Sequence, residues 1–181
     1  MSRIPPVDDQ EARAVFGGDS PFRYRVYAQA PDLVVGHLEW AAKLHDRSSL
    51  PARLVELVRL RVAFHNQCRS CMALRYEDLD AGAVCSLEKP YEAPDLSVAE
   101  KAALAFADRF ATNHLSIDDQ VFADTRHHFS DKQVVELLYH LATFVGFGRM
   151  AAVLDLTDDL PAAYQDKSRA VAPWSHAPAE P

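Results

Sequence analysis

Cys68 and Cys71 lie three residues apart in a chain that has only three cysteines among its 181 residues. The pair belongs to the stretch FHNQCRSCMALR, residues 64–75. A Cys-x-x-Cys pair at the start of a helix can act as a redox pair, because the helix N-terminus stabilises a thiolate. The same pair can form half of a metal site, so the rest of the sequence has to decide between the two chemistries.

Metal binding finds little support along the chain. A zinc site would have to recruit Cys85 or His65, because no second Cys-x-x-Cys and no His-x-x-x-His follows at ligand spacing. We therefore expect no metal. The chain also lacks a GxGxxG sequence, a Walker loop and a flavin fingerprint, so we expect no nucleotide cofactor.

The net charge of −7, from 19 Lys and Arg against 26 Asp and Glu, argues against nucleic-acid and anionic-membrane partners, which require a basic surface. No apolar run approaches the roughly 20 residues that a membrane span needs, and the sequence MSRIPPVDDQEARAVF lacks the apolar core of a secretory signal. We expect a cytoplasmic protein. Thiols are kept reduced in that compartment, and a chain of this length folds without disulfides, so a close cysteine pair suits catalysis better than structure.

Apolar residues recur at helical spacing through most of the chain, and no alternating run is long enough to predict a strand, so we expect an all-α fold. Pro31 begins one helix, Ser97 and Glu100 have the spacing of a capping box, and Ser130 is a further cap. Helices are expected within residues 31–47, 48–66, 68–82, 96–114, 116–129 and 130–156.

This pattern divides the chain into three parts. Residues 1–30, which include the aromatic segment PFRYRVY, are expected to form an arm, residues 31–160 the helical domain, and the proline-bearing residues 161–181 a tail. The aromatic arm and Trp174 in the tail have no obvious place in a monomeric helical core. We therefore expect them to cover a neighbouring subunit of a homo-oligomer.

A possible internal repeat appears when the sequence is shifted by 80 residues. The segment Val55-Glu56-Leu57 then falls on Val135-Glu136-Leu137. Apolar helices often share such letters, so coincidence explains the match equally well. If the copies are related, Gly148 and Ala151 replace the two cysteines in the second copy, which leaves the chemistry in the first.

The helix ending near Asn66 and the helix beginning at Cys68 are expected to form an antiparallel pair. Counting about 1.5 Å per residue from the turn places Glu56 and Arg75 at a similar depth. Cys71 lies four residues before Arg75, one turn above it on the same helix face. The expected stack is Glu56, Arg75, Cys71 and Cys68. A thiol near a cation and a helix N-terminus is acidic, and position alone favours Cys68 as the more acidic of the two.

The spacing Glu56-x11-Cys68-x2-Cys71, with the surrounding sequence LPARLVELVRLRVAFHNQCRSC, resembles the alkylhydroperoxidase D-like (AhpD-like) branch of the carboxymuconolactone decarboxylase superfamily. The resemblance extends over residues 31–156. It implies an all-helical fold assembled as dimers or trimers of dimers. It also implies an activity in which Cys71 attacks a hydroperoxide, Cys68 then closes a disulfide with it, and a separate thiol or dithiol reductant protein restores the pair.

The chain departs from the family pattern Glu-x11-Cys-x2-Cys-x3-His at its last position, which is Arg75. In the family, the Glu and the His relay a proton to the attacking cysteine. A guanidinium can pair with Glu56 and hold a thiolate, but it does not release a proton near neutral pH. The proton for the leaving group would then come from water, from Cys68, or from another histidine such as His65 or His140.

Less specific interpretations of the same residues remain open. Glu56 could be a solvated helix residue that pairs with Arg53 or Arg59. His140 could be a hydrogen-bonded core histidine. Cys85 is expected to be a small buried residue rather than a third redox group.

The leading hypothesis is a homo-oligomeric (dimer, trimer or hexamer) antioxidant enzyme that reduces a small hydroperoxide with its cysteine pair. One alternative is a cofactor-free decarboxylase or lactone-processing lyase like the namesake branch of the superfamily. That branch generally lacks the cysteine pair. Another alternative is a non-catalytic, redox-sensing module.

Overall fold

The computed structural model describes residues 1–175, which form helices and no β-strand, so the expected all-α fold is confirmed. A short 3-10 helix, η1 (His114–Ser116), joins two of the α-helices. The α-helices are α1 (Asp9–Phe16), α2 (Phe22–Tyr27), α3 (Pro31–Arg47), α4 (Ala52–His65), α5 (Arg69–Ala73), α6 (Ala81–Ser86), α7 (Val98–Thr112), α8 (Asp119–His128), α9 (Asp131–Leu154) and α10 (Ala162–Gln165).

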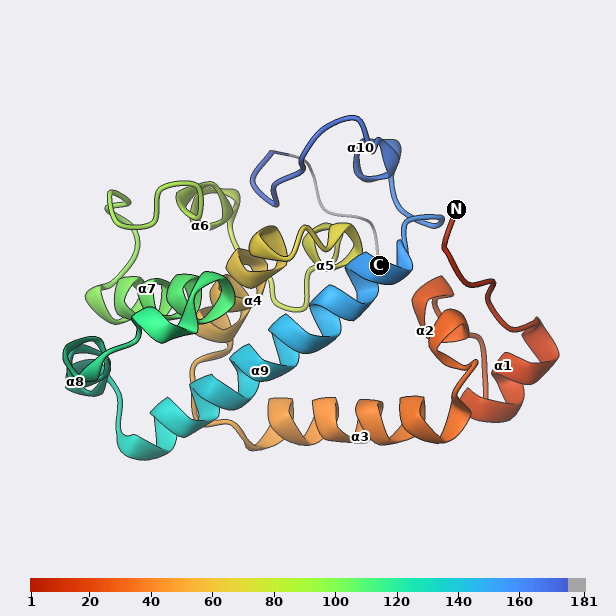
Figure 1. Cartoon of the computed structure of the whole chain (residues 1–181), viewed down its shortest axis with the longest axis horizontal. Coiled ribbons are helices and arrows are strands. Elements are labelled where there is room, and N and C mark those ends of the chain that lie inside the picture. The colour runs from red at the N-terminus through yellow and green to blue at the C-terminus, as the bar shows by residue number, and fades with distance from the viewer. Residues whose placement is uncertain (176–181) are drawn as a thin grey trace.

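Helix α4 lies at the centre of the bundle, between α7 and α9. Its side chains Leu57, Val58 and Leu60 have no exposed surface, as expected of a helix that is covered on several sides. In Figure 1, α9 crosses in front of α4, α3 runs along the lower edge, and α1 and α2 lie at the end of α3. The cysteine segment, which follows the C-terminal end of α4, is therefore surrounded by other helices.

Capping residues fix where the long helices begin. The Ser97–Glu100 capping box of α7 is present, and Ser130 caps α9 in a second box with Gln133. Pro31 stands at the start of α3. The Ser97 and Ser130 side chains satisfy backbone N–H groups that have no partner inside the helix, whereas the fixed φ of Pro31 suits the first turn of α3. All three confirm the helix starts predicted from the sequence.

Helix α9 has the length and mean hydropathy of a membrane-spanning helix, which the sequence analysis did not expect. In the bundle, one side of α9 packs against α4, α5, α7 and α8. The opposite side carries exposed apolar residues such as Val135, Tyr139 and Val153. Packing therefore explains part of the apolar character of α9.

The single helix predicted for residues 68–82 is wrong, because α5 ends at Ala73 and α6 begins at Ala81. Leu74 has an extended backbone, and the guanidinium of Arg59 binds the carbonyl oxygens of Cys71 and Leu74. The Cys71 carbonyl would otherwise accept the next hydrogen bond of the helix. A side chain from α4 thus ends α5.

Both terminal segments pack against their own chain. Helices α1 and α2 contact α3, and α10 contacts α5. The Trp174 ring lies 4.7 Å from the ring of Phe64, measured between centroids. Since these aromatic groups are accommodated within one chain, they no longer argue for a neighbouring subunit, and the homo-oligomer stays a prediction.

The possible repeat relates α4 and α5 to α9, and these segments pack against one another. They differ in one respect: α4 ends at His65, whereas α9 continues unbroken through Gly148 and Ala151. The duplication therefore stays a prediction.

Candidate active site

The two cysteines form a disulfide at the start of α5, and Cys85 is free, as the sequence predicts. Their Cα atoms are 5.2 Å apart, within the usual range for a disulfide. Cys68 is the N-cap residue of α5 and its sulfur accepts a hydrogen bond from the Cys71 N–H at 3.3 Å. Cys68 is fully buried, whereas Cys71 is partly exposed.

A tight turn places the pair. Gln67 has a left-handed backbone with φ of 49°, which ends α4 and redirects the chain into α5. The Asn66 side chain donates to the Phe144 carbonyl at 2.9 Å and lies over Gly148 of α9. A Cβ atom at Gly148 would lie 2.5 Å from the Asn66 amide nitrogen. A larger residue at position 148 would displace the Asn66 amide, so Gly148 helps to hold the turn that carries Cys68.

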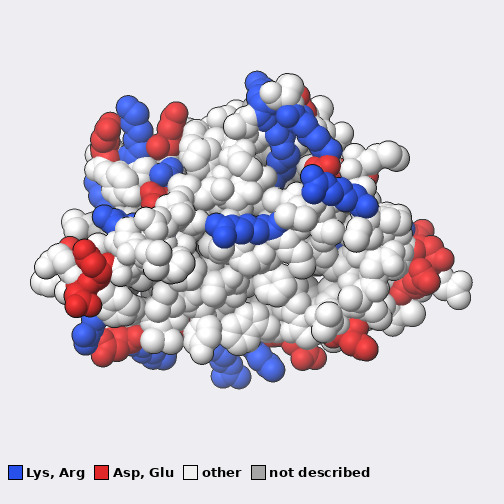
Figure 2. Space-filling model, viewed as in Figure 1, with Lys and Arg blue, Asp and Glu red and all other residues white. Residues whose placement is uncertain are grey.

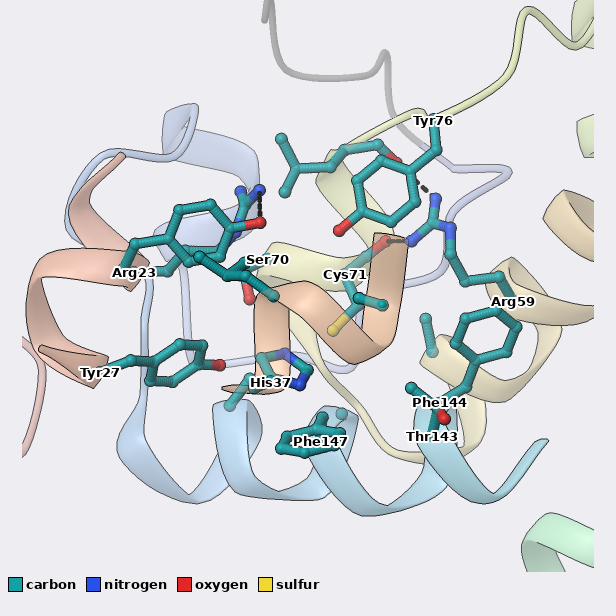
Figure 3. Close-up of a pocket in the computed structure, with 17 residues that line it drawn as sticks. Arg23, Tyr27, His37, Arg59, Ser70, Cys71, Tyr76, Thr143, Phe144 and Phe147 are labelled. Carbon is teal, nitrogen blue, oxygen red and sulfur yellow. Dashed lines mark hydrogen bonds between the residues drawn. The ribbon is translucent and has the colours of Figure 1, made fainter. Parts of the chain in front are cut away.

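Cys71 opens onto a cavity of about 240 Å³ between α2, α3, α4, α5 and α9 (Figure 3). Aromatic and aliphatic side chains make up most of its wall. Its polar wall residues are Arg23, Tyr24, Tyr27, His37, Arg59, Ser70, Tyr76 and Thr143. A partly exposed sulfur in a mostly apolar cavity can meet a small organic molecule away from bulk water.

Glu56 pairs with Arg59, and the expected Glu56–Arg75 pair is wrong. The Arg59 guanidinium holds both carboxylate oxygens of Glu56, at 2.6 and 2.7 Å. Glu56 is only 2% exposed and Arg59 4%, so this is a buried pair and not a solvated helix-surface pair. Glu56 also accepts from the Tyr76 N–H at 3.2 Å.

The Glu56–Arg59 pair positions the backbone that follows Cys71. Arg59 donates to the carbonyl oxygens of Cys71 at 2.7 Å and Leu74 at 2.8 Å, and the first of these bonds is visible in Figure 3. Because Arg59 holds both carboxylate oxygens, Glu56 is a fixed anion in this state and not an open base.

Arg75 lies outside the cavity and binds backbone. Its guanidinium donates to the carbonyls of Met72 at 2.6 Å, Leu74 at 3.1 Å and Pro173 at 3.1 Å. Burial lowers the pKa of Arg75, although Tyr164 opposes this effect. The predicted alignment of Arg75 with Cys71 on one helix fails because α5 ends before residue 75. Arg75 instead fastens the C-terminal segment to the cysteine segment.

His65 belongs to a different group of hydrogen-bonded side chains, centred on Asp108. Its Nε2 lies 2.6 Å from Asp108, which also accepts hydrogen bonds from Arg61 and from the hydroxyl of Tyr91 at 2.6 Å. Burial opposes ionisation of Asp108, but His65, Arg61 and Tyr91 outweigh it and hold the carboxyl pKa well below its usual range. His65 does not line the Cys71 cavity as delimited by residues 1–175.

His140 is a buried histidine of α9, 3% exposed, and it packs against Phe144. Burial lowers its pKa to about 4, so the ring is neutral at pH 7. Its Nε2 has no hydrogen-bond partner within the described chain, which contradicts a fully hydrogen-bonded core histidine. His140 does not line the part of the cavity that residues 1–175 define.

Sequence reasoning missed His37, the histidine that does line the cavity. Its ring stacks on Phe147 with centroids 3.7 Å apart, and burial lowers its pKa. Its Nδ1 is buried without a hydrogen-bond partner among residues 1–175. In the view of Figure 3, the imidazole lies between the Tyr27 hydroxyl and the Cys71 sulfur. One signal was available: His37 interrupts the apolar stripe of α3, one turn after Val34.

Arg23 and Tyr27 were also missed, because residues 1–30 were read as an arm that covers another subunit. Both residues come from α2 and line the cavity. Burial raises the pKa of Tyr27 to about 12, with Arg23 acting in the opposite direction. Burial would lower the pKa of Arg23, but Tyr76, Tyr24 and Tyr27 raise it overall, so the guanidinium stays charged.

Cys85 is exposed on α6, so the expectation of a buried residue is wrong. It sits on the outer side of a six-residue helix and not after a helix end. Within residues 1–175, no three His, Cys, Asp or Glu side chains gather as a metal-binding group.

The chain was compared with known proteins. No protein family model matches it. Two uncharacterised proteins of Mycobacterium tuberculosis, MT2376 of strain CDC 1551 / Oshkosh and Rv2313c of strain H37Rv, are each 41% identical over 93 residues. The match covers 48% of this chain but only 32% of each relative, so it spans about a third of their length.

Among solved structures, the chain is similar to ATU0492 from Agrobacterium tumefaciens, a protein of unknown function described as a candidate antioxidant defence protein AhpD. The TM-score is 0.66 at 22% sequence identity, and the superposition covers 75% of this chain and 95% of that one. At this identity the likeness establishes the fold alone. The helical bundle that holds Cys68 and Cys71 is the AhpD-like fold.

Proposed function

We propose that the chain reduces organic hydroperoxides through Cys71 and Cys68. The observation that carries the proposal is the unequal setting of the two sulfurs: Cys71 faces the apolar cavity, and Cys68 is fully buried behind it at bonding distance. An attacking thiol needs access to substrate, whereas a resolving thiol needs access only to its partner.

In the first step, the Cys71 thiolate attacks the peroxide and the O–O bond breaks. Cys71 becomes a sulfenic acid, and the alkoxide that leaves takes up a proton to become an alcohol. The sulfur is oxidised and the hydroperoxide is reduced by two electrons. Cys68 then attacks the Cys71 sulfenic acid, which forms the disulfide of this structure and releases water.

A dithiol donor returns the enzyme to its reduced state. It exchanges thiolate for disulfide at the cysteine pair, supplies two electrons and two protons, and leaves as its own disulfide. Since Cys68 is buried, the donor has to attack the Cys71 sulfur from the cavity side.

His37 is the group that we assign to proton transfer. A neutral imidazole can take the proton from the Cys71 thiol and return it to the leaving alkoxide. Arg59 is bound to Glu56 and to backbone carbonyls, and a guanidinium does not give up a proton at this pH. His37 thus takes the part for which the sequence left water, Cys68, His65 and His140 open.

Purified protein mixed with cumene hydroperoxide and dithiothreitol tests the proposal, with peroxide loss as the readout. Cys71→Ser should abolish turnover. Cys68→Ser should retain one round of peroxide reduction and accumulate a sulfenic acid that dimedone traps. Cys85→Ser is the matched control and should behave as the parent, because Cys85 lies outside the cavity.

The same variants decide against the alternatives. A lyase of the carboxymuconolactone decarboxylase type would keep its activity in the Cys68→Ser, Cys71→Ser double variant. A redox-sensing module would form the disulfide with one equivalent of peroxide but would not turn over with a dithiol. Either result would contradict the peroxidase assignment.

A further inference from the structure

The cavity beside Cys71 contains two cations in very different settings. Arg59 is neutralised by the carboxylate of Glu56 and also binds two backbone carbonyls. Arg23 donates one hydrogen bond, to the Tyr24 hydroxyl at 3.3 Å, and forms no ion pair with any of residues 1–175. Arg23 is therefore a partly buried cation without a counterion in this part of the chain.

Acidic side chains are missing from the described wall of the cavity, whose 17 lining residues include neither Asp nor Glu. Phenol groups surround the guanidinium instead. The Arg23 guanidinium carbon lies 4.5 Å from the centre of the Tyr24 ring. Tyr27 and Tyr76 line the same cavity, and Figure 3 shows the hydroxyls of both directed toward its interior. A guanidinium with nearby hydroxyl donors is an arrangement suited to a carboxylate.

Apolar side chains make up much of the remaining wall. Leu38, Ala63, Leu74, Phe144 and Phe147 are among the residues that line it. A dry apolar cavity of about 150 Å³ accommodates benzene. The 240 Å³ available here therefore suits one ring, or a branched alkyl group of similar size, with a short substituent at each end.

We propose that this cavity selects organic hydroperoxides that carry a carboxylate, with the carboxylate on Arg23 and the peroxide at Cys71. The hydroperoxide part of this inference rests on the proposed function, whereas the carboxylate part rests on Arg23 alone. The bound anion supplies the counterion that the described wall lacks, and the apolar body fills the space between the two polar ends.

A matched pair of substrates tests the selection. One is 4-(2-hydroperoxypropan-2-yl)benzoic acid, and the other is its methyl ester, which has the same body without the charge. In the parent protein, kcat/KM for the acid should exceed that for the ester by roughly tenfold or more, the effect expected of a charge-assisted hydrogen bond. Equal values for acid and ester would overturn the inference.

Variants then show whether Arg23 is the cause. Arg23→Gln should bring the acid-to-ester ratio close to one, and Arg23→Lys should keep part of the preference. Arg47→Gln, which removes an exposed arginine at the end of α3, should leave the ratio unchanged. A preference that survives in Arg23→Gln, with its fold verified by circular dichroism, would assign the selection elsewhere and overturn the proposal.

A binding measurement separates this inference from the peroxidase proposal. Calorimetry with 4-isopropylbenzoate, which has no peroxide, should give a dissociation constant roughly tenfold higher for Arg23→Gln than for the parent. Its neutral amide should bind both proteins equally. Arg23-dependent binding without peroxide turnover would support the carboxylate site and contradict the peroxidase. Turnover without Arg23-dependent binding would support the peroxidase and contradict the carboxylate site.

Discussion

Access distinguishes the two sulfurs at the scale of single residues. Cys68 caps α5, and its sulfur accepts a hydrogen bond from the Cys71 N–H. Burial keeps that sulfur away from any substrate. Cys71 carries the same thiol group but faces the cavity, and this position makes it the attacking group that we propose.

His37 should give the reaction an acid limb. Burial lowers its pKa below the ordinary 6.5, so the imidazole is neutral at pH 7 and becomes charged only as the pH falls through that lowered value. The other ionisable groups on the cavity wall are Cys71, Arg23, Arg59 and three tyrosines. Since an imidazolium cannot take the thiol proton, kcat/KM should fall as the pH drops through this lowered pKa.

The variant that tests this is His37→Gln. It should lower kcat/KM for cumene hydroperoxide by roughly 10²-fold or more and should remove the acid limb that belongs to the imidazole. His65→Gln is the control, because His65 contacts Asp108 and not the cavity. A His37→Gln enzyme with the rate and pH profile of the parent would remove His37 from the mechanism.

The Glu56–Arg59 pair should matter more to stability than Arg75 does. Arg59→Met leaves the Glu56 carboxylate buried without its partner, which typically costs about 3–5 kcal/mol. Arg75→Met removes hydrogen bonds to three carbonyls that lie nearer the surface, and the loss should be smaller, on the order of 1–2 kcal/mol. Urea unfolding measures both values.

Activity adds a second comparison at these positions. Arg75→Met should keep peroxide turnover, and Arg75→His should introduce no new pH dependence, because Arg75 binds backbone carbonyls and does not line the described Cys71 cavity. Counting residues along one continuous helix instead predicts that Arg75 lies one turn from Cys71. Equal stabilities of Arg59→Met and Arg75→Met would contradict the buried pair, and an added histidine limb in Arg75→His would return residue 75 to the site.

At the scale of elements, sequence patterns located the long helices well and the short ones poorly. Apolar spacing and capping residues suffice for α3, α7 and α9, because these helices are specified by their own residues. The end of α5 is specified by Arg59, which lies on another helix, 14 residues before Ala73. A local sequence pattern contains no information about that contact. The helix predicted for residues 68–82 therefore extends beyond the end of α5 at Ala73.

Gly148 determines how closely α9 approaches the turn before α5, and this approach can be tested by substitution. Gly148→Ala would bring a methyl group 2.5 Å from the Asn66 amide, which holds the Phe144 carbonyl. The amide has to move and its hydrogen bond weakens, so we expect a loss of roughly 1–3 kcal/mol. We also expect faster alkylation of Cys68 in the reduced protein, because the turn that buries it is disturbed.

Gly36, inside α3, provides the matched control. A Cβ atom there meets nothing within 4 Å among the described atoms. Gly36→Ala should therefore stabilise the protein by about 0.5–1 kcal/mol through helix propensity. Thermal unfolding with opposite shifts for the two variants would support the close approach at Gly148, and equal stabilisation would refute it.

At the scale of the whole molecule, the exposed side of α9 is a continuous apolar stripe. It consists of Val135, Tyr139, Ala142, Gly146, Met150 and Val153. These residues follow one another at spacings of three and four, which is the pattern of a helix that packs against another helix. Figure 2 shows that charged side chains gather mainly toward the edges of this face of the molecule.

The stripe replaces the arms as the structural reason to expect a homo-oligomer. The aromatic arm and Trp174 are satisfied inside the chain, but the stripe faces outward, and Val153 at its end is 61% exposed. The sequence alone does not distinguish the covered side of α9 from the open one, because both are apolar.

Light scattering at micromolar concentration should therefore give a mass that is a multiple of 20.2 kDa. Tyr139→Asp with Val153→Asp places two charges in the stripe, where an apolar interface cannot solvate them, and should shift the protein toward monomer. Leu115→Asp is the matched control, because Leu115 is 83% exposed on η1 and lies outside the stripe. A parent mass of 20.2 kDa would end the prediction. An equal shift in the Leu115 variant would show that added charge, and not the stripe, controls assembly.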